Sequence, residues 1–149
     1  MRIVLDTNIL VRAHAKARGP ARELLQLIAG SPRHLLIVSP FLLQELERVL
    51  SDERVRAAAK LTSDEIAAYL DYLVAKRVSE IVFPGPAPRV VLSDPDDDPV
   101  VHTAVVGSAD VLCTLNRDFY SMAVRQYCQE RGVVVASDVE VFGLIRSQE

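Results

Sequence analysis

The sequence begins with an apolar stretch that ends abruptly on an acidic residue. Ile3-Val4-Leu5 is followed by Asp6, Thr7 and Asn8, and the apolar pattern resumes at residues 9–11. A short apolar run of this kind is typical of a buried strand, and the polar residues indicate where the chain turns into a helix. We therefore predict a buried strand that delivers the Asp6 carboxylate to its C-terminal end.

The rest of the chain alternates short apolar runs with longer amphipathic stretches. Further strands are predicted at residues 34–38, 81–83, 110–115 and 133–135, and residues 90–92 are a candidate extended segment. Helices are predicted at 9–14 and 20–29, from Ser39-Pro40 to Leu50, at 53–60, after the capping box at 62–65, through 104–106, at 119–131 and after the capping box at 137–140. Strands that are apolar on both faces and separated by helices favour a parallel sheet between two helix layers. The predicted fold is a three-layer α/β/α sandwich around a mainly parallel five-stranded sheet, in one domain over residues 1–149.

Composition narrows the class of protein. Cys113 and Cys128 lie in apolar surroundings and fit neither a disulfide framework nor a zinc site, so we expect two buried thiols in a reduced cytoplasm. Asp6 interrupts the first apolar run too early for a signal peptide, and no segment has the length of a membrane span. The net charge of −3 argues against binding of nucleic acid by charge alone. However, 14 of the 17 basic residues are Arg, whose guanidinium binds phosphate with two parallel hydrogen bonds, as Lys cannot.

Acidic and amide side chains gather where the strands of such a sheet would end. Sites in open parallel sheets lie at the carboxyl ends of the strands. The residues predicted there are Asp6, Thr7 and Asn8, then Ser39 and Glu45, then Asp94, Asp96, Asp97 and Asp98, and finally Thr114, Asn116, Arg117 and Asp118. Oxygen ligands of this kind suit Mg²⁺ or Mn²⁺, and two such ions about 3.5–4 Å apart are a common device for cleaving phosphodiesters. No glycine-rich phosphate loop and no Ser–His–Asp arrangement appears.

Each acid also has a simpler interpretation. Asp6 could only cap the next helix, Glu45 could extend into solvent, and Asp118 could be an ordinary turn residue. The run from Asp94 to Asp98 could be a solvated turn in which Asp98 precedes Pro99 as a helix cap. Together these segments still favour a site, because four of them place an acid at the same edge of one sheet.

Four motifs in this order resemble the PIN domain family. They are residues 4–8 (Val-Leu-Asp-Thr-Asn), Glu45 within residues 39–46, Asp94-Pro95-Asp96-Asp97 followed by Ala104, and residues 113–119. The chain is most similar to the bacterial VapC-like branch, the toxin component of type II toxin–antitoxin pairs. The resemblance implies Mg²⁺- or Mn²⁺-dependent hydrolysis of RNA to a 5′-phosphate and a 3′-hydroxyl. It also implies an antitoxin partner, and we expect a homodimer with no membrane association.

The resemblance assigns roles position by position. Asp6 is the first metal ligand, Glu45 the second acid and Asp97 the third, with the adjacent Asp98 as an alternative ligand. Thr7, Asn8 and Thr114 match positions that orient the acids. Asn116 stands where many members carry a fourth acid, so either Asn116 ligates or orients through its amide, or Asp118 takes that role. This departure leaves the choice between one metal ion and two open.

Two other functions fit the sequence less well. A PIN fold that has lost its chemistry could bind RNA or protein, an alternative that Asn116 and the acidic balance support and that Asp6, Glu45 and Asp97 oppose. A phosphatase-like hydrolase ranks last, because no nucleophilic Asp motif with a downstream Lys is evident. If the acids do converge, their mutual repulsion predicts a raised pKa for at least one of them in the metal-free protein.

Overall fold

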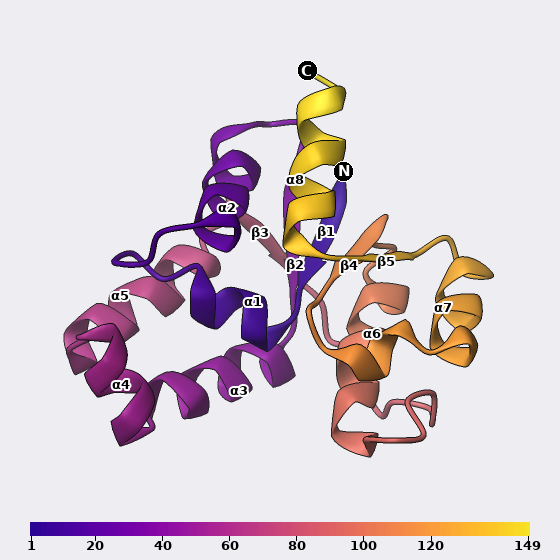
Figure 1. The fold of residues 1–149 in the computed structure, drawn as a ribbon, viewed down its shortest axis with the longest axis horizontal. Coiled ribbons are helices and arrows are strands. Elements are labelled where there is room, and N and C mark those ends of the chain that lie inside the picture. Colours follow the sequence, from indigo (N-terminus) through magenta and orange to yellow (C-terminus); the bar gives the residue numbers. More distant parts are fainter.

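The computed structural model describes all residues 1–149 and contains one five-stranded sheet (Figure 1). Its strands, in the spatial order β3-β2-β1-β4-β5, all pair in parallel, which confirms the predicted α/β fold. The strands are β1 (Arg2–Leu5), β2 (Leu35–Val38), β3 (Ser79–Ile81), β4 (Val111–Cys113) and β5 (Val134–Ala136).

Eight α-helices and two short 3₁₀ helices connect and cover the strands (Figure 1). The α-helices are α1 (Thr7–Arg12), α2 (Pro20–Gly30), α3 (Pro40–Ser51), α4 (Glu53–Ala59), α5 (Ser63–Leu73), α6 (Asp98–Val106), α7 (Met122–Gln129) and α8 (Asp138–Ser147). The 3₁₀ helices are η1 (Pro95–Asp97) and η2 (Arg117–Tyr120). None of the helices combines the length and the apolar content that crossing a membrane requires.

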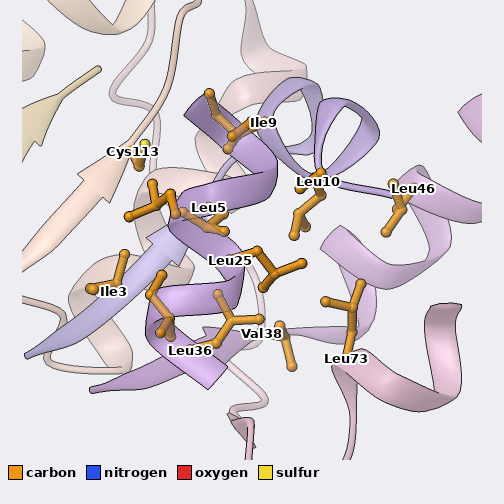
Figure 2. Packing of buried hydrophobic residues seen from close by; sticks show 14 of the residues in the cluster. Ile3, Leu5, Ile9, Leu10, Leu25, Leu36, Val38, Leu46, Leu73 and Cys113 are labelled. Carbon is orange, nitrogen blue, oxygen red and sulfur yellow. The ribbon is translucent and has the colours of Figure 1, made fainter. Parts of the chain in front are cut away.

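The sheet separates two hydrophobic clusters because alternate strand residues point to opposite faces. Ile3 and Leu5 of β1 pack into the larger cluster with α1, α2, α5 and α8, whereas Val4 packs into the smaller one with α6 and α7. Figure 2 shows the larger cluster, in which the strand residues Leu5 and Leu36 lie on one side of Leu25 of α2 and Leu10 of α1 lies on the other. Both helix layers of the predicted sandwich are therefore present, and each layer packs against apolar side chains on one face of β1.

The order of the strands places a crevice beside β1. From β1 the chain moves outward through β2 to β3, and it then crosses back to β4 on the other side of β1. The segments that follow β1 and β4 therefore lead in opposite directions from neighbouring strand ends. In parallel sheets, such a reversal of strand order opens a binding crevice at the carboxyl ends of the two strands. Asp6 follows one of these strands and Thr114 follows the other.

Two segments differ from the sequence prediction. The third strand lies at Ser79–Ile81 rather than at 81–83, because these residues pair with Leu36–Val38 of β2. Phe83 lies beyond the strand and its side chain is 77% exposed. Residues 90–92 form no strand, since the backbone N–H groups of Val90 and Val91 donate to a side chain, that of Asp98. In both places a tertiary contact outweighs the local apolar pattern.

Gly107, which follows α6, lies close against Ile37 of β2, and this contact gives a stability prediction. A Cβ at this position would lie 2.5 Å from Ile37 Cγ2 and 2.9 Å from the Thr103 carbonyl oxygen. We expect Gly107→Ala to lower the free energy of unfolding by about 1–3 kcal/mol, the usual cost of overpacking. Urea denaturation measures this loss.

The matched control is Gly143→Ala, which lies inside α8 and would place its Cβ in open space. Alanine is the better helix former, so this variant should be stabilised by about 0.5–1 kcal/mol. If Gly107→Ala had the same free energy of unfolding as Gly143→Ala, the contact with Ile37 would not restrict how closely the end of α6 packs against β2.

Candidate metal centre and nucleic-acid cleft

Asp6 is a buried carboxylate held by two hydrogen bonds. It directly follows β1 and is only 6% exposed. Its Oδ1 accepts a hydrogen bond from the backbone N–H of Thr7 at 2.7 Å, which caps α1. Its Oδ2 accepts one from the hydroxyl of Thr114 at 2.7 Å. Asp6 thus fills the capping role that the sequence left open, and its carboxylate also faces the crevice between β1 and β4.

Burial raises the pKa of Asp6 above its ordinary value, and the nearby charge of Glu45 raises it further. The two hydrogen bonds act in the opposite direction, because each favours the ionised form. In the absence of a cation, burial and the charge of Glu45 therefore disfavour the ionised form of the Asp6 carboxylate.

Thr114 and Asn116 connect Asp6 with the acids on the other side of the crevice. Thr114 is fully buried at the end of β4, and its Oγ1 also accepts a hydrogen bond from the backbone N–H of Asn116 at 3.0 Å. The Asn116 Nδ2 donates to Asp97 Oδ2 at 3.0 Å, and the Asn116 Oδ1 accepts from the N–H of Asp118 at 3.0 Å. Asn116 therefore orients Asp97 and Asp118 through both ends of its amide.

Asp97 has the most perturbed carboxyl group of the crevice. Its pKa is raised to about 7, first by burial and then by the charges of Asp94, Asp6 and Asp118, while the hydrogen bond from Asn116 lowers it. Carboxylates that crowd together resist simultaneous ionisation unless a cation neutralises them. The direction of the pKa shift is the one expected for at least one of the acids, although burial contributes more to it than the neighbouring charges do.

Three acids from two segments meet on this side of the crevice. Asp94, Asp97 and Asp118 each place a carboxylate oxygen within 4.8 Å of the other two. Asp94 caps η1, where its Oδ1 accepts a hydrogen bond from the N–H of Asp96 at 3.0 Å. The sequence analysis placed Asp94 at this edge of the sheet but did not include it among the metal ligands, because the acidic run around Pro95 has no periodicity that tells which side chains face inward.

Asp94 and Asp97 line a cleft with a volume of about 760 Å³, and Asp118 lies beside it. Its walls carry Asp6, Thr7, Asn8, Glu45, Asp94, Asp96, Asp97 and Asn116, together with Arg12 and Arg48. Glu45 comes from α3 and forms an ion pair with Arg48 one turn further along the helix. The predicted residues Asp6, Glu45 and Asp97 thus share one cleft, although they lie far apart in the sequence.

The donors of the cleft fit a hard divalent cation. Carboxylate and amide oxygens predominate, and no sulfur or imidazole ligand lines the walls. The Oδ1 of Asn8 is buried and has no hydrogen-bond partner, which is uncommon for a buried polar atom and leaves it free to accept from a bound water or to face an ion. Asp6, Asp94, Asp97 and Asp118 are the residues that could hold Mg²⁺ or Mn²⁺, with Asn8 and Asn116 beside them.

Asp98 points away from this group of acids. It is 3% exposed, and its Oδ1 accepts hydrogen bonds from the N–H groups of Val90 at 2.9 Å and Val91 at 2.7 Å. Its Oδ2 lies 3.3 Å from Arg89 Nε. Of the two neighbouring acids in the predicted ligand set, Asp97 lines the cleft, whereas Asp98 forms hydrogen bonds with the loop that precedes η1.

We expect Asp98→Ala to destabilise the protein without removing a group of the cleft. The substitution leaves two N–H donors without their acceptor, and each buried unsatisfied donor costs about 1–3 kcal/mol. Chemical denaturation should show this loss, while calorimetric titration at low temperature should find Mn²⁺ affinity within a few-fold of wild type. A variant of normal stability that has lost Mn²⁺ binding would instead assign the ligand to Asp98.

A family model described as PIN domain matches residues 2–118, which include every acid of the cleft. No curated protein matches the sequence. Among solved structures, a chain of the crystal structure of VapBC2 from Rickettsia felis, bound to a DNA fragment from their promoter, superposes with a TM-score of 0.55. The match has 18% sequence identity and covers 92% of this chain and 98% of that chain, so it shows a shared fold. Since the family model extends over most of the sequence, from β1 into η2, the chain belongs to the PIN domain family.

Proposed function

We propose that this protein is a Mg²⁺- or Mn²⁺-dependent ribonuclease and the toxin of a type II toxin–antitoxin pair. The observation that carries the proposal is the convergence of Asp6, Glu45 and Asp97 in one cleft, with Asp94 and Asp118 beside Asp97. A divalent ion in such a cleft supplies an activated water and neutralises phosphate oxygens. The reaction would be hydrolysis of a phosphodiester bond.

The side chains of the cleft have separate tasks in this proposal. Asp6 and Asp97 would hold the cation, and Thr114 and Asn116 fix the orientation of these two carboxylates through the hydrogen bonds described above. Glu45, on the α3 wall, is the group that receives a proton from the attacking water. A positioned carboxylate within reach of that water would contribute general-base catalysis.

Two arginines give the cleft contacts for the RNA backbone. Arg12 lies in the last turn of α1, and its guanidinium forms no ion pair or hydrogen bond within the protein, while Arg48 presents an exposed guanidinium beside Glu45. Guanidinium groups recognise phosphate oxygens in a fork geometry, so both residues suit phosphates that flank the scissile bond. They also explain how a chain with a net charge of −3 can hold a polyanion at one place.

Removal of metal tests the proposal directly. With EDTA, we expect cleavage of single-stranded RNA to fall by at least about 100-fold, and added Mn²⁺ or Mg²⁺ should restore it. Mn²⁺ should also bind more weakly at pH 6 than at pH 8, because a proton on Asp97, whose pKa is about 7, competes with the ion. Gel analysis of the RNA and calorimetric titration with Mn²⁺ measure the two effects.

Cleavage that persists in EDTA would contradict the assignment. RNA binding without cleavage at any metal concentration would instead support the binding-module alternative. We place the antitoxin partner in the same proposal, because the structural neighbour VapBC2 was crystallised on promoter DNA. Expression of this chain alone should then arrest growth, and co-expression of the product of an adjacent gene should relieve the arrest.

A further inference from the structure

A second hollow, of about 740 Å³, lies where η2 leads into α7. It is lined by Tyr120, Met122, Arg125, Gln126, Gln129 and Glu130. Tyr120 belongs to the same 3₁₀ helix as Asp118, and two residues of chain separate their Cα atoms by at most about 7 Å. One side of the hollow therefore begins at the 3₁₀ helix that also carries Asp118, one of the three grouped acids.

Tyr120, which lines the hollow, forms a hydrogen bond with Thr114 beside the cleft. Its hydroxyl donates to the carbonyl oxygen of Thr114 at 2.7 Å, and Thr114 is the residue that holds Asp6. Burial raises the pKa of Tyr120 to about 12, so the hydroxyl keeps its proton at neutral pH and remains a donor. The ring is thus fixed relative to the acids, which is the condition for a specific contact.

The side chains around this ring suit the face and the edge of a nucleobase. The Arg125 guanidinium lies over the Tyr120 ring with its Cζ 4.9 Å from the ring centroid, and Arg125 is exposed on its outer side. Met122 is 84% exposed and adds an apolar side chain to the same hollow. Bases stack on guanidinium planes and aromatic rings, and the carboxamides of Gln126 and Gln129 can pair with base edges.

The charge of the hollow favours a base over a phosphate. Arg125 is its one cation and Glu130 its one anion, so the lining has no net charge. Glu130 accepts a hydrogen bond from Gln126 Nε2 at 3.2 Å and lies 3.8 Å from Arg131. A phosphate bound here would lie near the Glu130 carboxylate, and the lining has no excess of positive charge to offset the repulsion. A nucleobase is uncharged, polar and flat, so it could stack on the Arg125 guanidinium and form hydrogen bonds with the glutamine carboxamides.

We propose that the hollow formed by Tyr120, Met122 and Arg125 is a base-binding subsite for a nucleotide that flanks the scissile phosphate of single-stranded RNA. The subsite rests on the proposed ribonuclease function and adds a source of sequence preference to it. The acids act on the backbone, which is the same at every position of an RNA strand. The base that stacks on Arg125 is then what makes one phosphodiester bond a better substrate than another.

The test compares protein variants on RNA with and without the base in question. The probe is a fluorescein-labelled single-stranded RNA of mixed sequence, together with copies in which one abasic nucleotide is moved stepwise away from the cleavage site. We expect Arg125→Ala to raise KM about tenfold on the intact RNA, with kcat little changed, as expected for loss of one stacked base. On the copy that lacks the flanking base, Arg125→Ala and wild type should have the same KM.

Two further variants separate stacking from charge. Arg125→Lys keeps the positive charge but loses the flat guanidinium, so it should behave like Arg125→Ala. The matched control is Arg146→Ala, which removes a guanidinium that lies over the Phe142 ring at 5.7 Å in α8, a helix that packs on the opposite face of the sheet from α6 and α7. This control should leave KM on every RNA unchanged.

Other outcomes would overturn the subsite. An Arg125→Ala effect of equal size on intact and abasic RNA would show a contact with the backbone only. Unchanged RNA kinetics combined with loss of a dimer or of a protein complex would make the hollow a protein interface. Failure of the ribonuclease proposal is separate, since wild type would then show no Mn²⁺-dependent cleavage. Anisotropy of the same labelled RNAs on Asp6→Asn protein would still report whether Arg125 contacts a base.

Discussion

The Asp6→Asn variant is expected to lose Mn²⁺-dependent cleavage of RNA by at least about a thousandfold in kcat/KM, the equivalent of about 4 kcal/mol of transition-state stabilisation. Asp6 is the buried carboxylate between the two walls of the cleft, and Asn offers the cation a neutral oxygen in place of a charged one. Cleavage of a labelled RNA over a range of Mn²⁺ concentrations measures the loss.

The fold should survive this substitution. An Asn side chain can still accept the hydrogen bond from the Thr7 N–H through Oδ1, and its Nδ2 can donate to the Thr114 hydroxyl oxygen. Removing the buried charge also removes the cost that raises the pKa of Asp6. We therefore expect metal-free Asp6→Asn to unfold at a urea concentration equal to or above that of wild type, so that lost activity cannot be attributed to unfolding.

The matched control is Asp71→Asn, which neutralises an exposed acid of α5 that makes no ion pair or hydrogen bond. It should cleave RNA like wild type. If Asp6→Asn protein, expressed in a host that lacks the wild-type gene, retained cleavage, the metal-ligand role of Asp6 and the ribonuclease mechanism built on it would both be wrong.

The Asp97→Asn variant is expected to show two opposite effects. It should lose cleavage by about 100-fold or more, because it removes a charged ligand from the group of acids. Without metal it should be more stable than wild type at pH 8, by about 1–2 kcal/mol after allowance for the partial exposure of Asp97. That gain corresponds to about 3–6 °C in Tm for a chain of this size.

The direction of the pH dependence follows from the raised pKa of Asp97. The folded protein binds the Asp97 proton more tightly than the unfolded chain does, because the pKa is about 7 when folded against an ordinary value of 3.8. The stability that this proton contributes is complete below about pH 4 and is lost as the pH rises through 7. Asn cannot lose such a proton, so the variant and wild type should converge near pH 4.

Thermal unfolding at several pH values, with EDTA and with saturating Mn²⁺, tests both effects together. Mn²⁺ should raise the Tm of wild type but hardly that of Asp97→Asn, so the order of stability at pH 8 should reverse when the ion is added. Asp71→Asn should follow wild type under every condition. Equal stability of Asp97→Asn and wild type at pH 8 in EDTA would show that the Asp97 carboxylate is not crowded.

Local patterns predicted β1, β2, β4 and β5 because each of these strands carries apolar residues on both faces. Val4 and Leu5 face opposite helix layers, so the apolar pattern of β1 is uninterrupted and easy to recognise. The pattern was less informative at the sheet edge, where β3 contains Ser79 and Glu80 and the more apolar Phe83 lies outside. An edge strand is defined by its pairing with β2, which its own residues do not encode.

The roles of individual acids needed the tertiary structure to different degrees. Asp6 could be predicted, because it ends the first strand and that strand is unambiguous. Asp97 and Asp98 are adjacent and chemically identical, and only the approach of Val90 and Val91 to Asp98 leaves Asp97 for the cleft. The sequence does not tell whether Asn116 ligates a metal ion or orients the acids. In the structure its Nδ2 donates a hydrogen bond to Asp97.

By itself, the sequence determined the alternation of strands and helices, the parallel sheet and the set of strand ends that carry acids. These follow from periodicity and capping, which are local properties of a few consecutive residues. The tertiary structure alone decided which acids share the cleft, how Asn116 orients them and that Asp94 joins them. These depend on contacts between η1 and η2, about 20 residues apart in the chain, and on their approach to the end of β1, about 90–110 residues away, which strand order and packing set.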